Sequence, residues 1–514
     1  VKYLIKNGVN ELIVQFRSPL NEVAEKMKSM DYTLPADNDQ AGKTSPHSRK
    51  APYHYGWDWG PCIVTSGIWK GVELVGWDDW HVHNFRINNK QVTQKRADLE
   101  IELNVIADTK NDLKITLSEL ITGMDFEQKF KINVGQNELS FNICLPNPEL
   151  WWPYGHGDQI LHHFSLKAET NDQLEHLERK FGIRNVNVKR VEDEKGESFE
   201  IYVNDMPIYS KGANWIPADY FVERLEIEDY RRLLKDAKRA NMNTLRIWGG
   251  GIYEPDHFYE LCDEMGIMVW QDFMFACSMY PAEDSFLESV DKEARYQVNR
   301  LKSYASVILW CGNNEVASAW LSWGWKEQLP DSIWDDYKKL FHELLPKVCS
   351  EFDPQRLYWP SSPCHGTDQS NQDQIYGKGD NHYWGVWHGG DDFNAFDDNV
   401  GRFMTEYGMQ SFPSMSMIES FTSEKDRSLD SDVMNAHQKA SLGTGNLMKY
   451  VEDYYQVNDD FDSIAGLSQI MQAEAIRFAV ETHRRNMPYC MGTLYWQFND
   501  CWPVISWSSI DYGG

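Results

Sequence analysis

Two glutamates follow short apolar runs that have the pattern of buried strands. Residues 307–311 (VILWC) lead into a polar turn that ends in Glu315, and residues 402–405 are followed directly by Glu406. An unbroken apolar run bounded by turn residues is typical of a strand covered on both faces, as in a parallel sheet. In a barrel of such strands, the chemistry lies at their carboxyl ends. Two carboxylic acids at that edge are the minimum equipment for cleaving a glycosidic bond.

The overall composition limits the classes of partner. The chain of 514 residues holds 78 acidic residues and has a formal net charge of −28, which disfavours nucleic acid and anionic membrane surfaces. With so many acids, a solvated or helix-capping role for either glutamate remains the alternative. The 21 tryptophans either fill large cores or stack on the apolar faces of sugar rings. A neutral ligand in an acidic, solubilising shell fits these numbers.

The cysteines and the hydropathy give no sign of a metal, a cofactor or a membrane span. The nine cysteines are scattered singly, without a C-x-x-C pair or zinc-ligand spacing, so we expect buried free thiols. No run approaches 18 apolar residues. His365, His382 and His388 lack ligand spacing, and we expect them to be structural or to contact sugar. We predict no metal and no cofactor.

The ends of the chain suggest a piece of a longer protein. The sequence opens on Val1 inside a strand-like run, ends at Tyr512-Gly-Gly514 and shows no signal peptide. We therefore expect truncation at both ends. The length predicts two to four domains.

Residues 1–80 have an all-β pattern. We predict strands at 11–16 and 68–75, separated by a polar loop at 37–46 and an aromatic cluster at 53–61. The cluster holds Trp57 and Asp58 between glycines. A packing plug and part of a binding site are equally good interpretations of it.

Residues 81–184 repeat the β pattern as a second sandwich. Residues 98–105 alternate strictly between polar and apolar, which is typical of a half-buried strand. Further strands are predicted near 113–117, 130–134 and 162–166, at intervals that suit a small β-sandwich. We expect a scaffold role for this domain.

From residue 185 to 514, short buried strands alternate with helices, which predicts a parallel sheet. The eight strand candidates are 208–213, 244–248, 268–272, 307–311, 357–360, 380–384, 402–405 and 492–497. Helices are predicted at 226–240, from Pro255 to Met265 with Gly266 as the stop, at 286–301 and at 333–348. Eight such strands make a (β/α)8 TIM barrel, with the long segment 413–487 packed outside it. Glu315 would then end the fourth strand and Glu406 the seventh.

Several motifs resemble those of the β-mannosidases of glycoside hydrolase family 2. They are residues 55–61 (YGWDWGP), 212–217 (GANWIP), 246–254 (RIWGGGIYE), 270–277 (WQDFMFAC), 310–315 (WCGNNE), 404–408 (MTEYG) and 495–500 (YWQFND). The resemblance implies an incomplete jelly-roll-like, sugar-binding-like β-sandwich, an immunoglobulin-like β-sandwich and a catalytic TIM barrel. Further β domains of the family are absent from this sequence.

The resemblance also implies roles for single residues. Glu315 is expected to be the general acid/base and Glu406 the nucleophile of a retaining exo-β-mannosidase. Asn314 would bind the 2-hydroxyl, Tyr383 would donate to the nucleophile, and Asp58 would bind the non-reducing sugar. Arg246 would hold Glu406 ionised or form a structural ion pair. The remaining candidate sugar contacts are Trp57, Trp248, Trp384, Trp387 and Trp496.

Three alternatives stay open at this stage. The enzyme could be a β-galactosidase or exo-glucosaminidase of the same family, or the barrel could bind carbohydrate without catalysis. The expected partner is a β-mannoside or manno-oligosaccharide, with no nucleic acid or membrane partner and with a monomer or homodimer as the assembly. The motifs favour a periplasmic or secreted location, or a lysosomal one if the source is eukaryotic.

Overall fold

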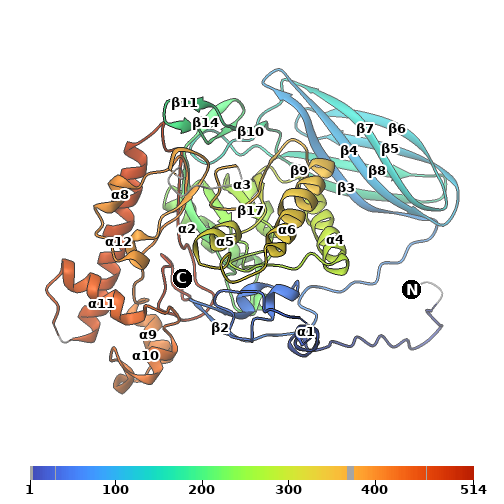
Figure 1. The fold of residues 1–514 in the computed structure, drawn as a ribbon. Coiled ribbons are helices and arrows are strands. Elements are labelled where there is room, and N and C mark those ends of the chain that lie inside the picture. Colours follow the sequence, from blue (N-terminus) through green and yellow to red (C-terminus); the bar gives the residue numbers. More distant parts are fainter. Residues whose placement is uncertain (1–3, 29, 367–375, 459) are drawn as a thin grey trace.

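The computed structural model describes residues 4–28, 30–366, 376–458 and 460–514. Figure 1 shows an N-terminal segment, a β-sandwich and a barrel with an attached helical region. No helix within these ranges combines the length and the apolar character that a membrane crossing needs. All nine cysteines are free thiols, as expected from their scatter, but Cys62 is exposed and Cys144 and Cys364 are only partly buried.

The β-sandwich has two antiparallel sheets. One has the order β3-β4-β7 and the other the order β6-β5-β8-β9. Their strands are β3 (Trp80–Thr93), β4 (Arg96–Ala107), β5 (Asn111–Glu119), β6 (Met124–Ile132), β7 (Gly135–Pro146), β8 (His162–Glu169) and β9 (Leu174–Phe181). Buried and half-exposed residues alternate along β4, as in a strand with one face on the core. The sandwich predicted from that alternation is confirmed.

A small β region leads from the sandwich to the barrel. Its strands are β10 (Val186–Lys189), β11 (Glu192–Asp193), β12 (Gly196–Glu197), β13 (Glu200–Val203) and β14 (Met206–Ile208). Strands β10, β13 and β14 form one antiparallel sheet, and β11 pairs with β12.

The barrel is built from eight parallel strands in the order β19-β18-β17-β16-β15-β22-β21-β20. They are β15 (Ser210–Trp215), β16 (Thr244–Ile247), β17 (Met268–Asp272), β18 (Val307–Cys311), β19 (Leu357–Trp359), β20 (Asn381–His382), β21 (Met404–Glu406) and β22 (Gly492–Tyr495). Each overlaps one of the eight predicted strands, so the predicted count and order are confirmed. Their carboxyl ends share one edge, which places Glu315 and Glu406 in the same mouth.

Side chains link the two outermost strands of the curled sheet. Asp380, which precedes β20, accepts a hydrogen bond from Nε1 of Trp359 in β19 at 2.7 Å and from Oγ of Ser362 at 2.6 Å. Its backbone also bridges to Cys364. A buried carboxylate thus joins β19 to β20 where the strand ladder is interrupted.

Helices follow most of the barrel strands. They include α2 (Ile227–Arg239), α3 (Asp256–Met265), α4 (Asp284–Leu301), α5 (Val316–Ser322), α6 (Ser332–Lys338) and α7 (Leu345–Phe352), with the π-helical η4 (Lys339–Leu344) joining the last two. Pro255 caps the start of α3 and Gly266, at φ 75°, ends it in the left-handed conformation. The four predicted helices are confirmed within a few residues at each end.

The segment between β21 and β22 packs outside the barrel, as expected. It carries α9 (Met415–Phe421), α10 (Asp432–Ala436), α11 (Gly443–Tyr454) and α12 (Phe461–Arg485), and the short α8 (Ala395–Asp398) lies between β20 and β21. Figure 1 shows these helices together on one side of the molecule.

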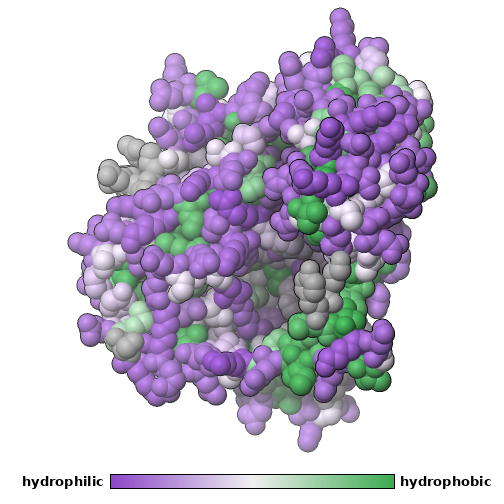
Figure 2. Space-filling view, turned by 90° about the vertical axis from the view of Figure 1, so that its right-hand side faces the viewer, coloured by the Kyte–Doolittle hydropathy of each residue, from purple (hydrophilic) through white to green (hydrophobic). Residues whose placement is uncertain are grey.

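The N-terminal segment differs from its predicted structure. Residues 11–16 and 68–75 are not strands, and the segment holds α1 (Pro19–Met27) and the hairpin β1 (Tyr55–Trp57) and β2 (Gly60–Cys62). Both predicted strands are wrong here because a strand needs a neighbour to pair its backbone, and neither segment has one among the described residues. Their apolar side chains, such as Leu12 and Val72, are exposed. Figure 2 shows the side of the molecule that lies on the right in Figure 1, with apolar surface gathered on its lower part beside a hollow.

Candidate active site

Glu315 is held at the carboxyl end of β18 by a tight turn. Its φ is 59°, in the left-handed region, and its backbone N–H donates to the carbonyl of Ser362 at 2.8 Å. The turn is close to the next strand, since a Cβ on Gly312 would lie 2.3 Å from the carbonyl oxygen of Pro360. Only glycine fits there. The turn therefore directs the Glu315 side chain into the mouth of the barrel.

Glu406 ends β21 and is bound to a buried arginine. Nη1 of Arg246, on β16, donates to Oε1 of Glu406 at 2.6 Å. Arg246 also binds Asp272 at 2.8 Å, Asn314 at 2.7 Å and Asn214 at 3.0 Å. The side chain of Arg246 has no exposed surface. These four polar partners fix the guanidinium and, through it, the nucleophile candidate Glu406.

His382, at the end of β20, lies between the two acids. Its Nδ1 is 2.8 Å from Oε1 of Glu315 and 3.4 Å from Oε2 of Glu406. The closest atoms of all three groups lie within 4.8 Å of one another. Retaining glycosidases separate their carboxyl groups by about 5–5.5 Å and inverting ones by about 6.5–9.5 Å. The short separation fits the retaining geometry.

Burial shifts the pKa of each acid. It raises the pKa of Glu315 to about 7, against a lowering contribution from the Cys277 thiol and from Arg246. It raises the pKa of Glu406 to about 6, and here the bound Arg246 opposes the rise. Glu406 has the direct cation and Glu315 does not. As the pH rises, Glu406 therefore loses its proton first and Glu315 loses its proton second.

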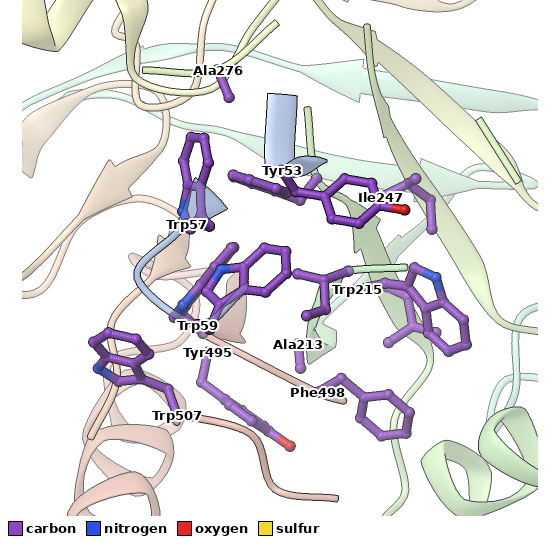
Figure 3. Close-up of a cluster of buried hydrophobic side chains, with 14 of the residues drawn as sticks. Tyr53, Trp57, Trp59, Ala213, Trp215, Ile247, Ala276, Tyr495, Phe498 and Trp507 are labelled. Carbon is purple, nitrogen blue, oxygen red and sulfur yellow. The ribbon is translucent and has the colours of Figure 1, made fainter. Parts of the chain in front are cut away.

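The aromatic hairpin β1–β2 packs against the barrel mouth (Figure 3). Nε1 of Trp502 donates to the carbonyl of Trp59 at 2.6 Å, and the hydroxyl of Tyr220 donates to the carbonyl of Pro61 at 3.0 Å. The ring of Trp57 meets that of Trp248 edge to face, with centroids 4.7 Å apart. The hairpin is thus a packing element, and the same packing brings its turn residue Asp58 to the site.

Asp58 is half-buried, and one of its carboxyl oxygens is buried without a protein partner among the described residues. Its Oδ1 is buried and makes no hydrogen bond within the part of the chain that the structure describes. Burial, followed by the charges of Asp37, Glu315 and Glu406, raises the pKa of Asp58 to about 8. An unpartnered buried acceptor of this kind is ready for a ligand hydroxyl. Of the two interpretations that the sequence left equal, the packing role of the hairpin is shown, and the binding role of Asp58 stays a prediction.

Tyr383 does not occupy its expected position. Its hydroxyl donates to Oδ2 of Asp391 at 2.7 Å, and only its backbone N–H reaches Glu406, at the carbonyl. The prediction that Tyr383 donates to the nucleophile is therefore wrong. Neighbouring residues of a strand point to opposite faces, and it is His382 that points inward.

The tryptophan candidates divide by exposure. Trp248 and Trp387 are 1% and 0% exposed, and Trp387 packs on Tyr450 and Trp507. As sugar platforms these two predictions are wrong in this structure, because neither ring presents a free face. Trp384 is half-buried, and Trp496 contacts Trp248 edge to face. Trp384 is therefore the one tryptophan of the five with a partly exposed side chain, and Trp57 and Trp496, each 5% exposed, stay candidates only for contact through a ring edge.

Sequence reasoning missed several groups that share the site. Asp272 binds Arg246, Cys277 donates to Oε2 of Glu315 at 3.5 Å, and the charge of Asp37 acts on Asp58 and Glu315. The signal for Asp272 was its position at the end of a predicted strand. Nothing in the sequence marks Asp37, which comes from a distant loop that bridges to Ser278 beside the barrel.

The three groups Glu315, His382 and Glu406 are close enough to hold a metal ion by distance alone. The guanidinium of Arg246 already lies 2.6 Å from Glu406, so a second cation would be repelled. A shared proton suits this arrangement better than a metal does.

Two family models match the chain. "Glycosyl hydrolase 2 galactose-binding domain-like" matches residues 1–70, and "Glycosyl hydrolases family 2" matches residues 80–184. The matched residues are domains of glycosyl hydrolases family 2. The first match also identifies the N-terminal segment as part of a galactose-binding-like domain, although few of its residues are in strands here.

Similar proteins extend the likeness over the barrel. Beta-mannosidase B of Emericella nidulans is 36% identical over 99% of the chain and 62% of the relative, and that of Aspergillus niger is 36% identical over 90% and 56%. The crystal structure of β-D-mannosidase from Dictyoglomus thermophilum is 40% identical, with a TM-score of 0.89 over 96% of this chain and 60% of that one. The Amycolatopsis orientalis exo-chitosanase CsxA, at 20% identity and a TM-score of 0.66 over 84% and 51%, shares the fold. The chain thus spans about three fifths of the length of these mannosidases.

Proposed function

We propose that this chain carries the active site of a retaining exo-β-mannosidase. The observation that carries the proposal is that Glu315 and Glu406 lie together at the carboxyl ends of the barrel strands, with carboxyl oxygens within 4.8 Å. Sequence likeness to the β-mannosidases supports mannose as the sugar.

In the first step, Glu406 attacks the anomeric carbon. Its Oε1 is bound by Arg246, so Oε2 is the oxygen left to form the new bond. The bond from the anomeric carbon to the glycosidic oxygen breaks, and Glu315 gives its proton to that oxygen. A covalent glycosyl-enzyme and a free aglycone result.

In the second step, Glu315 acts as the base. It takes a proton from water, whose oxygen attacks the anomeric carbon and releases Glu406 as a carboxylate. Two inversions give net retention. The raised pKa of Glu315 suits both steps, because a group with a pKa near the working pH can give and take a proton.

Other groups would position the sugar. Asn314 lies beside Glu315, and Arg246 holds its Oδ1, which fixes the amide for contact with the 2-hydroxyl. Asp58 would accept hydrogen bonds from hydroxyls of the terminal mannose. The hairpin that carries Asp58 comes from the N-terminal segment and packs against the mouth of the barrel. A sugar chain could not extend past it, which supports removal of one terminal residue at a time.

A panel of p-nitrophenyl glycosides tests the proposal. We expect the β-mannoside to be hydrolysed with a kcat/KM at least about tenfold above the β-galactoside, β-glucoside and β-glucosaminide. The control is Glu406→Gln from the same preparation, which should be inactive on all four. NMR of the first product should show the β-anomer of mannose.

Three other results of the glycoside panel would contradict the proposed activity or its mechanism. Faster hydrolysis of the galactoside or glucosaminide would assign another activity of the family. Binding without hydrolysis would indicate a non-catalytic barrel. A first-formed α-anomer would contradict the retaining mechanism.

A further inference from the structure

Asp380 is a buried carboxylate with four hydrogen-bond donors. Its Oδ1 accepts from Nε1 of Trp359 at 2.7 Å and from the backbone N–H of Cys364 at 2.8 Å. Its Oδ2 accepts from Ser362 at 2.6 Å and from Thr405 at 2.7 Å. An ionised carboxylate only accepts, and four donors fill its sites. Asp380 therefore fixes where the two hydroxyl protons point.

The hydroxyl of Ser362 has one proton and three neighbours that could take it, the farthest of which is Oγ1 of Thr405 at 3.4 Å. Oδ2 of Asp380 lies at 2.6 Å, and Nε2 of His382 lies at 3.1 Å. The shorter, charge-assisted bond to the carboxylate is the stronger one. The proton of Ser362 therefore points to Asp380, and its oxygen can only accept from His382.

This arrangement selects one tautomer of His382. Since Oγ of Ser362 accepts, Nε2 must carry the hydrogen. Burial lowers the pKa of His382 to about 4, so the ring is neutral and has a single N–H. Nδ1 is then a bare lone pair, and it lies 2.8 Å from Oε1 of Glu315. A hydrogen bond across that distance needs a proton on Glu315.

We propose that Asp380 and Ser362 are positioning residues that place the ring proton of His382 on Nε2, so that its bare Nδ1 holds Glu315 in the protonated, acid form. This inference rests on the proposed function, in which Glu315 is the general acid/base. After the proton leaves, the lone pair offers no stabilisation to the carboxylate. Glu315 stays a strong base for the second step.

Other charged and titratable groups also face the pair. They are Arg246 on β16, Cys277 after β17, Glu406 on β21, and Asp37 and Asp58 from the N-terminal segment. Arg246 and Cys277 favour the ionised form of Glu315, and the acids favour the protonated form. None of them touches Nε2 of His382. The contact with Ser362 can therefore be varied while these charges stay in place.

The tautomer can be measured without any catalytic assay. Nitrogen-detected NMR of the chain labelled with ¹⁵N-histidine distinguishes Nε2–H from Nδ1–H, and the signal of His382 is the one lost in His382→Gln. We expect Nε2–H in the unchanged chain at neutral pH. We expect Nδ1–H in Ser362→Ala, because Nε2–H would have no acceptor there, whereas Nδ1–H can donate a hydrogen bond to the Glu315 carboxylate. Nδ1–H in the unchanged chain would overturn the proposal.

The pH profile tests the effect on Glu315. In Ser362→Ala, Nδ1–H donates to the Glu315 carboxylate and stabilises it, so the basic limb of kcat/KM should move to lower pH by about one unit. The backbone carbonyl of Ser362 still binds Glu315, so the turn is retained. The matched control is Thr405→Val, which removes the other hydroxyl from Oδ2 of Asp380 and does not touch His382. Its basic limb should stay in place.

The outcomes separate the positioning role of Ser362 from the proposed function of the chain. An equal shift of the limb in both variants would mean that Ser362 only supports Asp380, and the proposal would fail. No shift in Ser362→Ala would also overturn it. A chain that hydrolyses none of the glycosides would contradict the proposed function, while the NMR result would still decide the tautomer.

Discussion

Arg246 and Glu406 are joined by a fully buried hydrogen bond of 2.6 Å between Nη1 and Oε1. The same guanidinium binds Asp272 and two asparagines, so it is part of the barrel's interior as well as of the site. The two interpretations that the sequence left open for Arg246, a partner of the nucleophile and a structural ion pair, both describe this one side chain.

Arg246→Lys tests whether the site needs the planar guanidinium group of Arg246. An ammonium keeps the charge but cannot bind Glu406, Asp272 and Asn314 in the same geometry. We expect kcat/KM on the β-mannoside to fall by about 10²-fold or more, since small displacements of a reacting group have effects of this size. Urea unfolding should show a loss of stability, which reaches about 3–5 kcal/mol when a buried pair is broken by removing one partner. Full activity in the lysine variant would contradict the role.

The pH dependence of kcat/KM follows from the two acids. Glu406 must be ionised, so activity should fall as the pH drops below its pKa of about 6. Glu315 must be protonated, so activity should fall as the pH rises above its pKa of about 7. We expect a bell-shaped profile with its maximum between these values. A profile that stays flat from pH 5 to 9 would contradict the assignment of both acids.

Glu315→Gln and Glu406→Gln should differ by leaving group. Without its acid, the Glu315 variant should lose about 10²–10⁴-fold on a mannobioside. Its first step on p-nitrophenyl β-mannoside should suffer less, because p-nitrophenolate leaves without a proton. The Glu406 variant should lose both reactions and form no covalent adduct in intact-mass measurements. The reverse pattern would exchange the two roles.

Asp58→Ala tests whether the hairpin belongs to the site. Oδ1 of Asp58 has no hydrogen-bond partner within the described ranges, so its removal breaks no bond at that atom. We expect kcat/KM to fall by at least about 10²-fold, as when a buried contact to substrate is lost. Thermal unfolding should be unchanged or shifted upward, because a buried, unpaired carboxyl is costly. A loss below threefold would return the hairpin to a packing role alone.

Trp59→Ala is the matched test of the packing role. Trp59 has no exposed surface and lies against Trp248 with ring centroids 5.6 Å apart. We expect a destabilisation of about 3–5 kcal/mol in urea unfolding, as for other buried tryptophans. An unchanged midpoint would show that the hairpin is not held by this ring.

The sequence by itself determined the barrel and the two acids. Most of its eight strands lie in short, largely apolar runs between turn residues, and this local pattern is enough because both faces of a parallel sheet are buried. Glu406 directly follows such a run and Glu315 follows one after a short polar turn, and in a barrel the carboxyl ends of all strands meet. The helix from Asp256 to Met265 was equally local, since Pro255 and Gly266 mark its ends.

Only the tertiary structure decided which polar groups meet these acids. The inward direction of His382 instead of Tyr383 depends on strand register, because a shift of one residue exchanges the two faces. Asp37 and Asp58 reach the barrel from an N-terminal segment whose predicted strands at 11–16 and 68–75 did not form, since pairing depends on neighbours far away in the chain. Local patterns place a residue on its own element, and contacts between distant elements depend on how the whole chain packs.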